Sequence, residues 1–126
     1  MLDTKVYVYN ALKNDAPLVA ALGSSTRIQY MYPNDFNTLP IVTYQETNNR
    51  NETFYDDAPV ADESTIEIHV WTNVSTSAIS KLVDTVMTGI LYARDYAADV
   101  PDPDAKIFHK VLRYRRSITA DDLDSI

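Results

Sequence analysis

Two histidines are the residues of this sequence that come nearest to a catalytic or metal-binding set. His69 and His109 lie in two segments that the residue pattern predicts as separate strands. Imidazoles beside an Asp can bind a metal ion, but the sequence has no HExxH motif and no Cys/His set at ligand spacing. We therefore predict two sheet histidines that face solvent or a neighbouring chain, and no metal site.

Carboxylates are plentiful, but nearly all of them lie in predicted loops. The main examples are Asp56-Asp57, Asp102, Asp104 and Asp121-Asp122. Two acids divide acid and base roles only when burial separates their pKa values, and exposed loops do not supply that burial. Solvated acidic loops are the interpretation that we prefer.

Other catalytic and nucleotide-binding motifs are absent from the sequence. Ser24-Ser25 is not part of a G-x-S-x-G elbow. A Walker loop or a dinucleotide fingerprint requires several glycines, and the chain has only Gly23 and Gly89. We predict that the protein is not an enzyme and uses no cofactor.

Composition narrows the class of protein further. A chain of 126 residues without cysteine is long enough to form one domain, here residues 1–126, without disulfides. The formal charge of −7 opposes binding of nucleic acid through its phosphates. There is no signal-peptide pattern and no stretch of about 18 apolar residues, so we expect folding in the cytoplasm and no membrane contact.

Residues 64–91 organise the predicted fold. Ile66, Ile68 and Val70 alternate with polar or aromatic residues, which predicts a strand with one core face. After Asn73 the apolar residues recur at helical spacing, as Ile79, Leu82, Val83, Val86, Met87, Ile90 and Leu91. A helix over 74–91 with one apolar stripe must pack on a face of the sheet.

Two short helices are predicted near the N-terminus. The first begins with Asp3 or Thr4 as its cap, and the second runs between Asp15 and Gly23. The apolar face of the first helix is predicted as Leu2, Val6, Tyr9 and Leu12.

Three more strands are predicted, at 27–32, 41–47 and 106–118, the first with Ile28, Tyr30 and Tyr32 on one face. The remaining segments are predicted as an arm or loop at 48–64, a second long connection at 92–105 and a flexible acidic tail at 119–126. The expected fold is therefore α+β, with a mostly antiparallel sheet of about four strands and a long amphipathic helix on one face.

The last strand carries the basic cluster of the sequence, which consists of Lys110, Arg113, Arg115 and Arg116. On a strand, Arg113 and Arg115 share a face, and Arg116 points to the other face. Two interpretations remain open at this point. The arginines pair with acids across the sheet, or they meet the acidic loops of a second subunit.

The order of these segments resembles the tail completion proteins of long-tailed bacteriophages, also called tail terminator or tail-to-head joining proteins. The resemblance rests on VYNALKNDAPLVAALG, RIQYMYP, LPIVTYQE and IEIHVWT, the last followed by an amphipathic helix. It covers residues 5–91 and, more weakly, 106–118. Residues 48–63 and 92–105 do not match the family's pattern.

The resemblance implies a small α+β subunit that forms a hexameric ring. In that family the ring caps the tail tube, ends its polymerisation and presents a surface to the head connector, without an active site or cofactor. The implied partners are copies of the same chain, the major tail tube protein and a head-completion or stopper protein. DNA passes through the ring without specific binding, and the implied location is the head–tail junction of the virion.

A ring closed by head-to-tail contacts needs two different complementary patches on each subunit. For the subunit interface we predict Trp71, Tyr44, Arg113, Arg115 and Arg116. For an arm that docks on the tail tube or on a neighbour we predict Arg50, Phe54, Tyr55, Asp56 and Asp57. Trp71 lies opposite the apolar face of its strand, so we expect a second layer or a neighbouring subunit to cover it.

Two other functions compete with this one. The first is a connector-side stopper or adaptor protein, which also forms a ring. The second is a small α+β ligand-binding or regulatory module that acts as a homo-oligomer, and it would require a pocket with convergent polar groups. The mass of the purified protein distinguishes a sixfold ring from a stable dimer.

Overall fold

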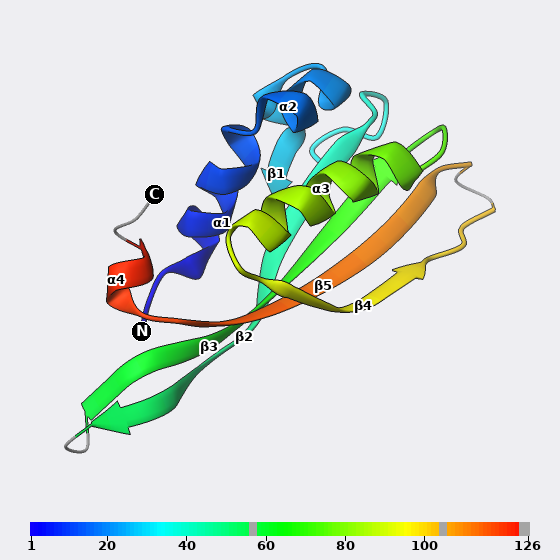
Figure 1. Ribbon diagram of the computed structural model, residues 1–126. Coiled ribbons are helices and arrows are strands. Elements are labelled where there is room, and N and C mark those ends of the chain that lie inside the picture. The colour runs from blue at the N-terminus through cyan, green and yellow to red at the C-terminus, as the bar shows by residue number, and fades with distance from the viewer. Residues whose placement is uncertain (56–57, 104–105, 124–126) are drawn as a thin grey trace.

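The structure is a single twisted sheet of five strands with helices on one face (Figure 1). This computed structural model describes residues 1–55, 58–103 and 106–123, and within 52–60 it describes only the strand backbone. The strands are β1 Ile28–Tyr30, β2 Ile41–Tyr55, β3 Ala58–Thr72, β4 Ala93–Asp99 and β5 Phe108–Ile118, in the order β1-β2-β3-β5-β4. Only β1 and β2 pair in parallel. The α+β class is confirmed, with five strands instead of about four.

Helices α1, α2 and α3 lie on the same side of this sheet (Figure 1). The helices are α1 Thr4–Lys13, α2 Ala16–Leu22, α3 Ser77–Gly89 and the short α4 Ala120–Leu123, and a 3-10 turn spans Ser25–Arg27. No helix of the described residues is long and apolar enough to cross a membrane.

The capping residues predicted for the two N-terminal helices are confirmed. The Asp3 carboxylate accepts from the backbone N–H of Val6, and the Asp15 carboxylate accepts from that of Leu18 at 3.1 Å. Gly23 ends α2 with a φ of +93°, a left-handed conformation that glycine adopts without strain.

The core lies between α3 and the even-numbered residues of β3 and β5. Ile66, Ile68 and Val70 are fully buried, as the strand pattern predicts. Val83 and Met87 of α3 are buried against the same face. Burying one such side chain stabilises the fold by about 1.5–3 kcal/mol. The helix predicted over 74–91 is shorter, because α3 begins at Ser77 and ends at Gly89. Leu91 lies beyond the helix and is 72% exposed.

The predicted apolar faces near the N-terminus are partly wrong. Tyr7, Val8 and Leu12 are the buried apolar residues of α1, whereas Val6 is 53% exposed. The reason is that α1 packs both on the sheet and against α2, which turns positions 8 and 12 inward.

The predicted strand over 27–32 is also too long. Ile28 is buried, but the chain leaves the sheet after Tyr30, at Met31, whose φ is 66°. Tyr32 therefore lies outside the strand and does not share its face with Ile28 and Tyr30 as predicted.

The segment 48–64 forms most of a long β-hairpin. Strands β2 and β3 pair from Ile41 opposite Trp71 to Tyr55 opposite Ala58, with bulges after Glu46 and near Thr53. This hairpin arm, residues 48–64, extends past the helices in Figure 1. Of its described residues, Ala61, Asp62 and Ser64 are buried, and two of these are polar, which explains why the segment lacks the apolar alternation by which strands are recognised.

The predicted connection at 92–105 contains the fifth strand, and the prediction of a loop throughout is wrong. β4 lies at the edge of the sheet, and almost every one of its residues is exposed. A strand exposed on both faces has no hydrophobic alternation, which explains why the sequence pattern missed it. At the other end of the chain, α4 occupies residues 120–123 of the segment predicted as a flexible tail.

Candidate interaction surface

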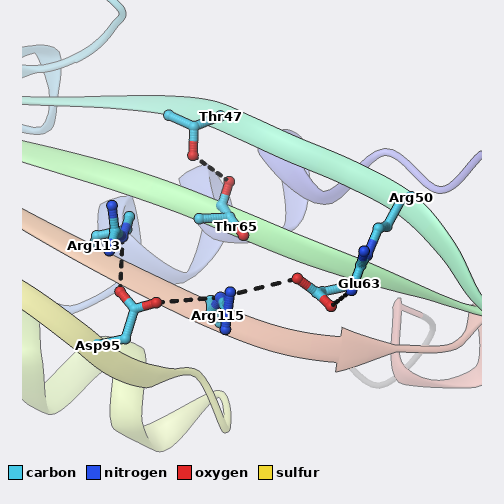
Figure 2. Close-up of polar contacts among 7 residues, drawn as sticks. All are labelled: Thr47, Arg50, Glu63, Thr65, Asp95, Arg113 and Arg115. Atoms are coloured by element: carbon cyan, nitrogen blue, oxygen red, sulfur yellow. Dashed lines mark hydrogen bonds and ion pairs between the residues drawn. The ribbon is translucent and has the colours of Figure 1, made fainter.

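The face of the sheet opposite α1, α2 and α3 carries most of the predicted interface residues. Because even-numbered residues of β3 and β5 enter the core, their odd-numbered residues form this helix-free face. On β2, the bulge between Glu46 and Asn48 changes the alternation, so that Arg50 stands opposite Glu63 of β3. The hydroxyl of Thr47, at the bulge, donates to the carbonyl oxygen of Thr65 at 3.5 Å (Figure 2).

Five residues of alternating charge cross four strands on the helix-free face (Figure 2). This charge chain consists of Arg50, Glu63, Arg115, Asp95 and Arg113. Its nitrogen–oxygen distances, in that order, are 2.8, 3.9, 3.2 and 2.9 Å. The bulge between Arg94 and Tyr96 in β4 places the Asp95 carboxylate between the two arginines of β5.

The two signs of charge in this chain differ in exposure. The side chains of Arg50, Arg113 and Arg115 are 65, 42 and 57% exposed, but those of Glu63 and Asp95 are only 15 and 29% exposed. Surface ion pairs of this kind contribute about 0–1 kcal/mol each, so the chain is not a major source of stability. The charge chain exposes guanidinium groups to solvent, although the net charge of the protein is −7.

An aromatic stack continues the helix-free face beyond the charge chain. Trp71 and His109 face each other across β3 and β5, with ring centroids 3.6 Å apart and planes 13° apart. The indole N–H of Trp71 donates to the Thr43 hydroxyl at 3.0 Å, and the ring of Phe36 meets the indole edge-on. Groups of the same chain therefore cover part of Trp71, which was expected to need a second layer.

The two histidines form a hydrogen-bonded pair. His69 Nδ1 lies 2.6 Å from His109 Nε2, and His69 Nε2 lies 2.7 Å from a Glu67 carboxylate oxygen. An ionised carboxylate only accepts, so His69 Nε2 carries the proton and His69 Nδ1 accepts from the N–H of His109. Burial, and then the neighbouring His69, lower the pKa of His109 to about 4. His109 is therefore neutral near pH 7.

An open hollow of about 530 Å³ lies beside the aromatic stack. It is lined by Phe36, Trp71, Val100, Pro101, Asp102, Ile107 and His109. The lining is mainly apolar, and the indole N–H is already bonded to Thr43. Besides Trp71, the polar side chains of its lining are those of Asp102 and His109.

Tyr44, the other predicted aromatic anchor, lies on the opposite face of the sheet from Trp71. Its ring stacks on Tyr9 of α1 at 5.6 Å and tilts against Tyr30 of β1 at 5.5 Å. The ammonium groups of Lys5 and Lys13 lie 5.3 and 5.0 Å from the ring centres of Tyr30 and Tyr9. We call these five residues, at the β1 edge, the tyrosine patch.

Arg116 differs from its two neighbours in sequence, as the strand alternation predicts. Its side chain is only 9% exposed, and it donates to the Tyr7 hydroxyl at 2.8 Å and to the Ile90 carbonyl oxygen at 2.7 Å. Its guanidinium also pairs with Asp122 at 3.2 Å. Arg116 thus joins α1, α3 and α4 inside the subunit, whereas Arg113 and Arg115 pair with acids across the sheet.

The predicted docking residues of the hairpin arm are only partly described. Arg50 belongs to the charge chain, and Phe54 and Tyr55 occupy the last positions of β2. Asp56 and Asp57 lie outside the described residues.

Sequence analysis placed the arginines and histidines on strands but missed their partners. Glu63, Asp95 and the pairing of His69 with His109 depend on strand register, which the sequence does not specify. Arg113 and Arg115 are two residues apart on one strand, so their side chains lie on the same face. This spacing was the sequence feature that could have indicated one acid between them. No group of three metal-ligating side chains occurs in the described ranges.

The described residues thus form a mixed sheet with one helix-covered face and one face that carries the charge chain and the aromatic stack. A profile of the family described as "Tail completion protein gp17" matches residues 6–119. The chain therefore belongs to the tail completion protein family of bacteriophages, and it has a structural, tail-associated role in the virion.

A solved structure supports the fold independently. A chain of the structure titled "Virion of native gene transfer agent (GTA) particle" superposes with a TM-score of 0.65 at 16% identity. The match covers 90% of this chain and 92% of the other chain. No curated protein matches the sequence significantly.

Proposed function

We propose that this protein forms a hexameric ring that caps the phage tail tube, ends its polymerisation and joins the tail to the head connector. The observation that carries the proposal is the family match, which spans nearly the whole domain. The proposed position is the head–tail junction of the virion, after folding and assembly in the host cytoplasm. The proposed partners are further copies of the chain, the major tail tube protein and a head-completion or stopper protein.

The geometry of the subunit supports this proposal. The arginines of the charge chain and Trp71 lie on the helix-free face, and Tyr44 lies on the other face at the β1 edge. Two unlike surfaces on one subunit are what a head-to-tail ring requires. We propose Trp71, Tyr44, Arg113 and Arg115 as interface residues, and we leave out Arg116 because its guanidinium is held inside the subunit.

The test is the mass of the protein in the absence and presence of purified tail tubes. Because one chain has a mass of 14.2 kDa, a ring of six has a mass of about 85 kDa. We expect this species alone or on tube ends, and tubes of fixed length when the protein is present during their assembly. A stable dimer that leaves tube length unchanged would refute the proposal.

A further inference from the structure

We propose that the tyrosine patch is the docking site for the hairpin arm of the adjacent copy of this chain. This inference rests on the proposed ring and assigns one of its contacts. It joins Lys5, Lys13, Tyr9, Tyr30 and Tyr44 of one subunit to residues 51–60 of the next.

The patch is built from two elements that hold its side chains side by side. Lys5, Tyr9 and Lys13 follow one another at a spacing of four on α1 and therefore form one stripe of the helix. Tyr30 pairs with Tyr44 in the register of β1 and β2, and Tyr44 stacks on Tyr9. The stripe and the two strand residues thus make one continuous aromatic surface.

The patch has charges that remain available to a partner. Each lysine ammonium lies over a tyrosine ring, and neither forms an ion pair with a carboxylate of the described residues. By contrast, Arg113 and Arg115 on the helix-free face already share Asp95. The tyrosine patch is therefore a better binding site for an acidic segment than the helix-free face, whose arginines are already paired.

The patch also exposes aromatic surface. Tyr30 is 47% exposed, and Tyr32, which follows it, is 71% exposed. Exposed aromatic rings beside cations are typical of contact surfaces between proteins.

The hairpin arm has the complementary composition. The sequence of residues 51–60, NETFYDDAPV, contains three acids and two aromatic residues and no Lys or Arg. Its acids match the two lysines of the patch, and Phe54 and Tyr55 match the tyrosine rings.

The arm is also placed to reach another subunit. Eight residues of β2, 48–55, span about 25 Å at the usual rise of a strand. The arm extends away from α1, α2 and β1 in Figure 1, so it does not return to the patch of its own chain. A contact between the arm and the patch therefore joins two subunits by unlike surfaces, which is the head-to-tail geometry of a ring.

Charge reversal with rescue tests the contact. We expect the double variant Lys5→Glu, Lys13→Glu to lose the ring and to keep the wild-type free energy of unfolding. The control Lys81→Glu, on the exposed side of α3, should leave the ring intact. Adding Glu52→Lys, Asp56→Lys and Asp57→Lys to the double variant should restore the ring. An intact ring in the double variant would overturn the inference while leaving the proposed ring in place.

Crosslinking gives an answer even where charge reversal lowers stability. The chain has no cysteine, so the pair Tyr32→Cys and Glu52→Cys introduces the only two thiols. Under mild oxidation of rings we expect covalent ladders of several chains, and the pair Thr88→Cys and Glu52→Cys should give none. Crosslinks within a single chain, or rings that give no ladder on oxidation, would overturn the inference. Absence of any ring in the wild-type protein would instead refute the proposed function.

Discussion

At the scale of single residues, the protein separates charges that act inside the subunit from charges that face outward. Arg115 and Arg116 are adjacent in sequence, yet their side chains are 57 and 9% exposed. The alternation of a strand is enough to produce this difference. Truncation of Arg116 would therefore leave buried partners without a donor, whereas Arg115 shares its acids with neighbouring arginines.

The His69–His109 pair predicts a pH dependence of stability. The pKa of His109 is about 4 in the folded protein, below the ordinary value of 6.5, because burial and His69 disfavour its protonation. The unfolded chain then binds more protons between these values, so this stabilisation is complete above pH 6.5 and is lost as the pH falls towards 4. Partial exposure reduces the effect to about 1 kcal/mol.

We expect the variant His109→Gln to remove this dependence. Urea unfolding between about pH 7.5 and about pH 5 should show a smaller loss of free energy for the variant than for the wild type. Equal losses in the two proteins would show that His109 is protonated as easily in the folded chain as in the unfolded one.

At the scale of elements, the hairpin arm is separable from the domain that carries it. β5 pairs with β3 only from Asp62 opposite Ile118 to Thr72 opposite Phe108, so residues 52–61 lie beyond that pairing. At the root of the arm, Asp62 accepts from the backbone N–H of Leu2, and Asn49 donates to the Leu2 carbonyl oxygen. The N-terminal segment thus holds the root of the arm at Asn49 and Asp62.

We predict that shortening the arm abolishes capping without unfolding the subunit. Residues 52–61 are replaced by Asn-Gly, a two-residue turn that suits Asn51 opposite Asp62. The free energy of unfolding should change by less than about 1 kcal/mol, because Ala61 is the one buried apolar side chain described in the replaced segment. Tube length in an assembly reaction measures capping. Normal capping by a folded, shortened protein would refute a role of the arm in docking.

At the scale of the whole molecule, the charge of −7 per chain bears on the passage of DNA. We propose that acids line the bore of the ring, so that DNA slides through it without binding. Replacing exposed acids by Lys one at a time, for example Asp35, Asp99 and Asp121, should slow genome ejection for those in the bore. Ejection at the wild-type rate for every exposed acid would refute this proposal.

The sequence by itself determined those elements that bury one face. The Ile66–Ile68–Val70 strand, α3, the caps Asp3 and Asp15, and the stop at Gly23 follow from local periodicity and capping chemistry. The α+β class follows from their order. Each of these features depends on residues that are close in the chain.

Only the tertiary structure decided the features that depend on register and exposure. β4 is exposed at almost every residue, and the buried residues described in the hairpin arm are Ala61, Asp62 and Ser64, two of them polar. Neither sequence therefore carries an apolar periodic signal. The sharing of Asp95 by Arg113 and Arg115, and the stacking of Tyr9 on Tyr44, join segments far apart in the chain. Strand register and helix packing set these contacts, and local residue preferences do not encode them.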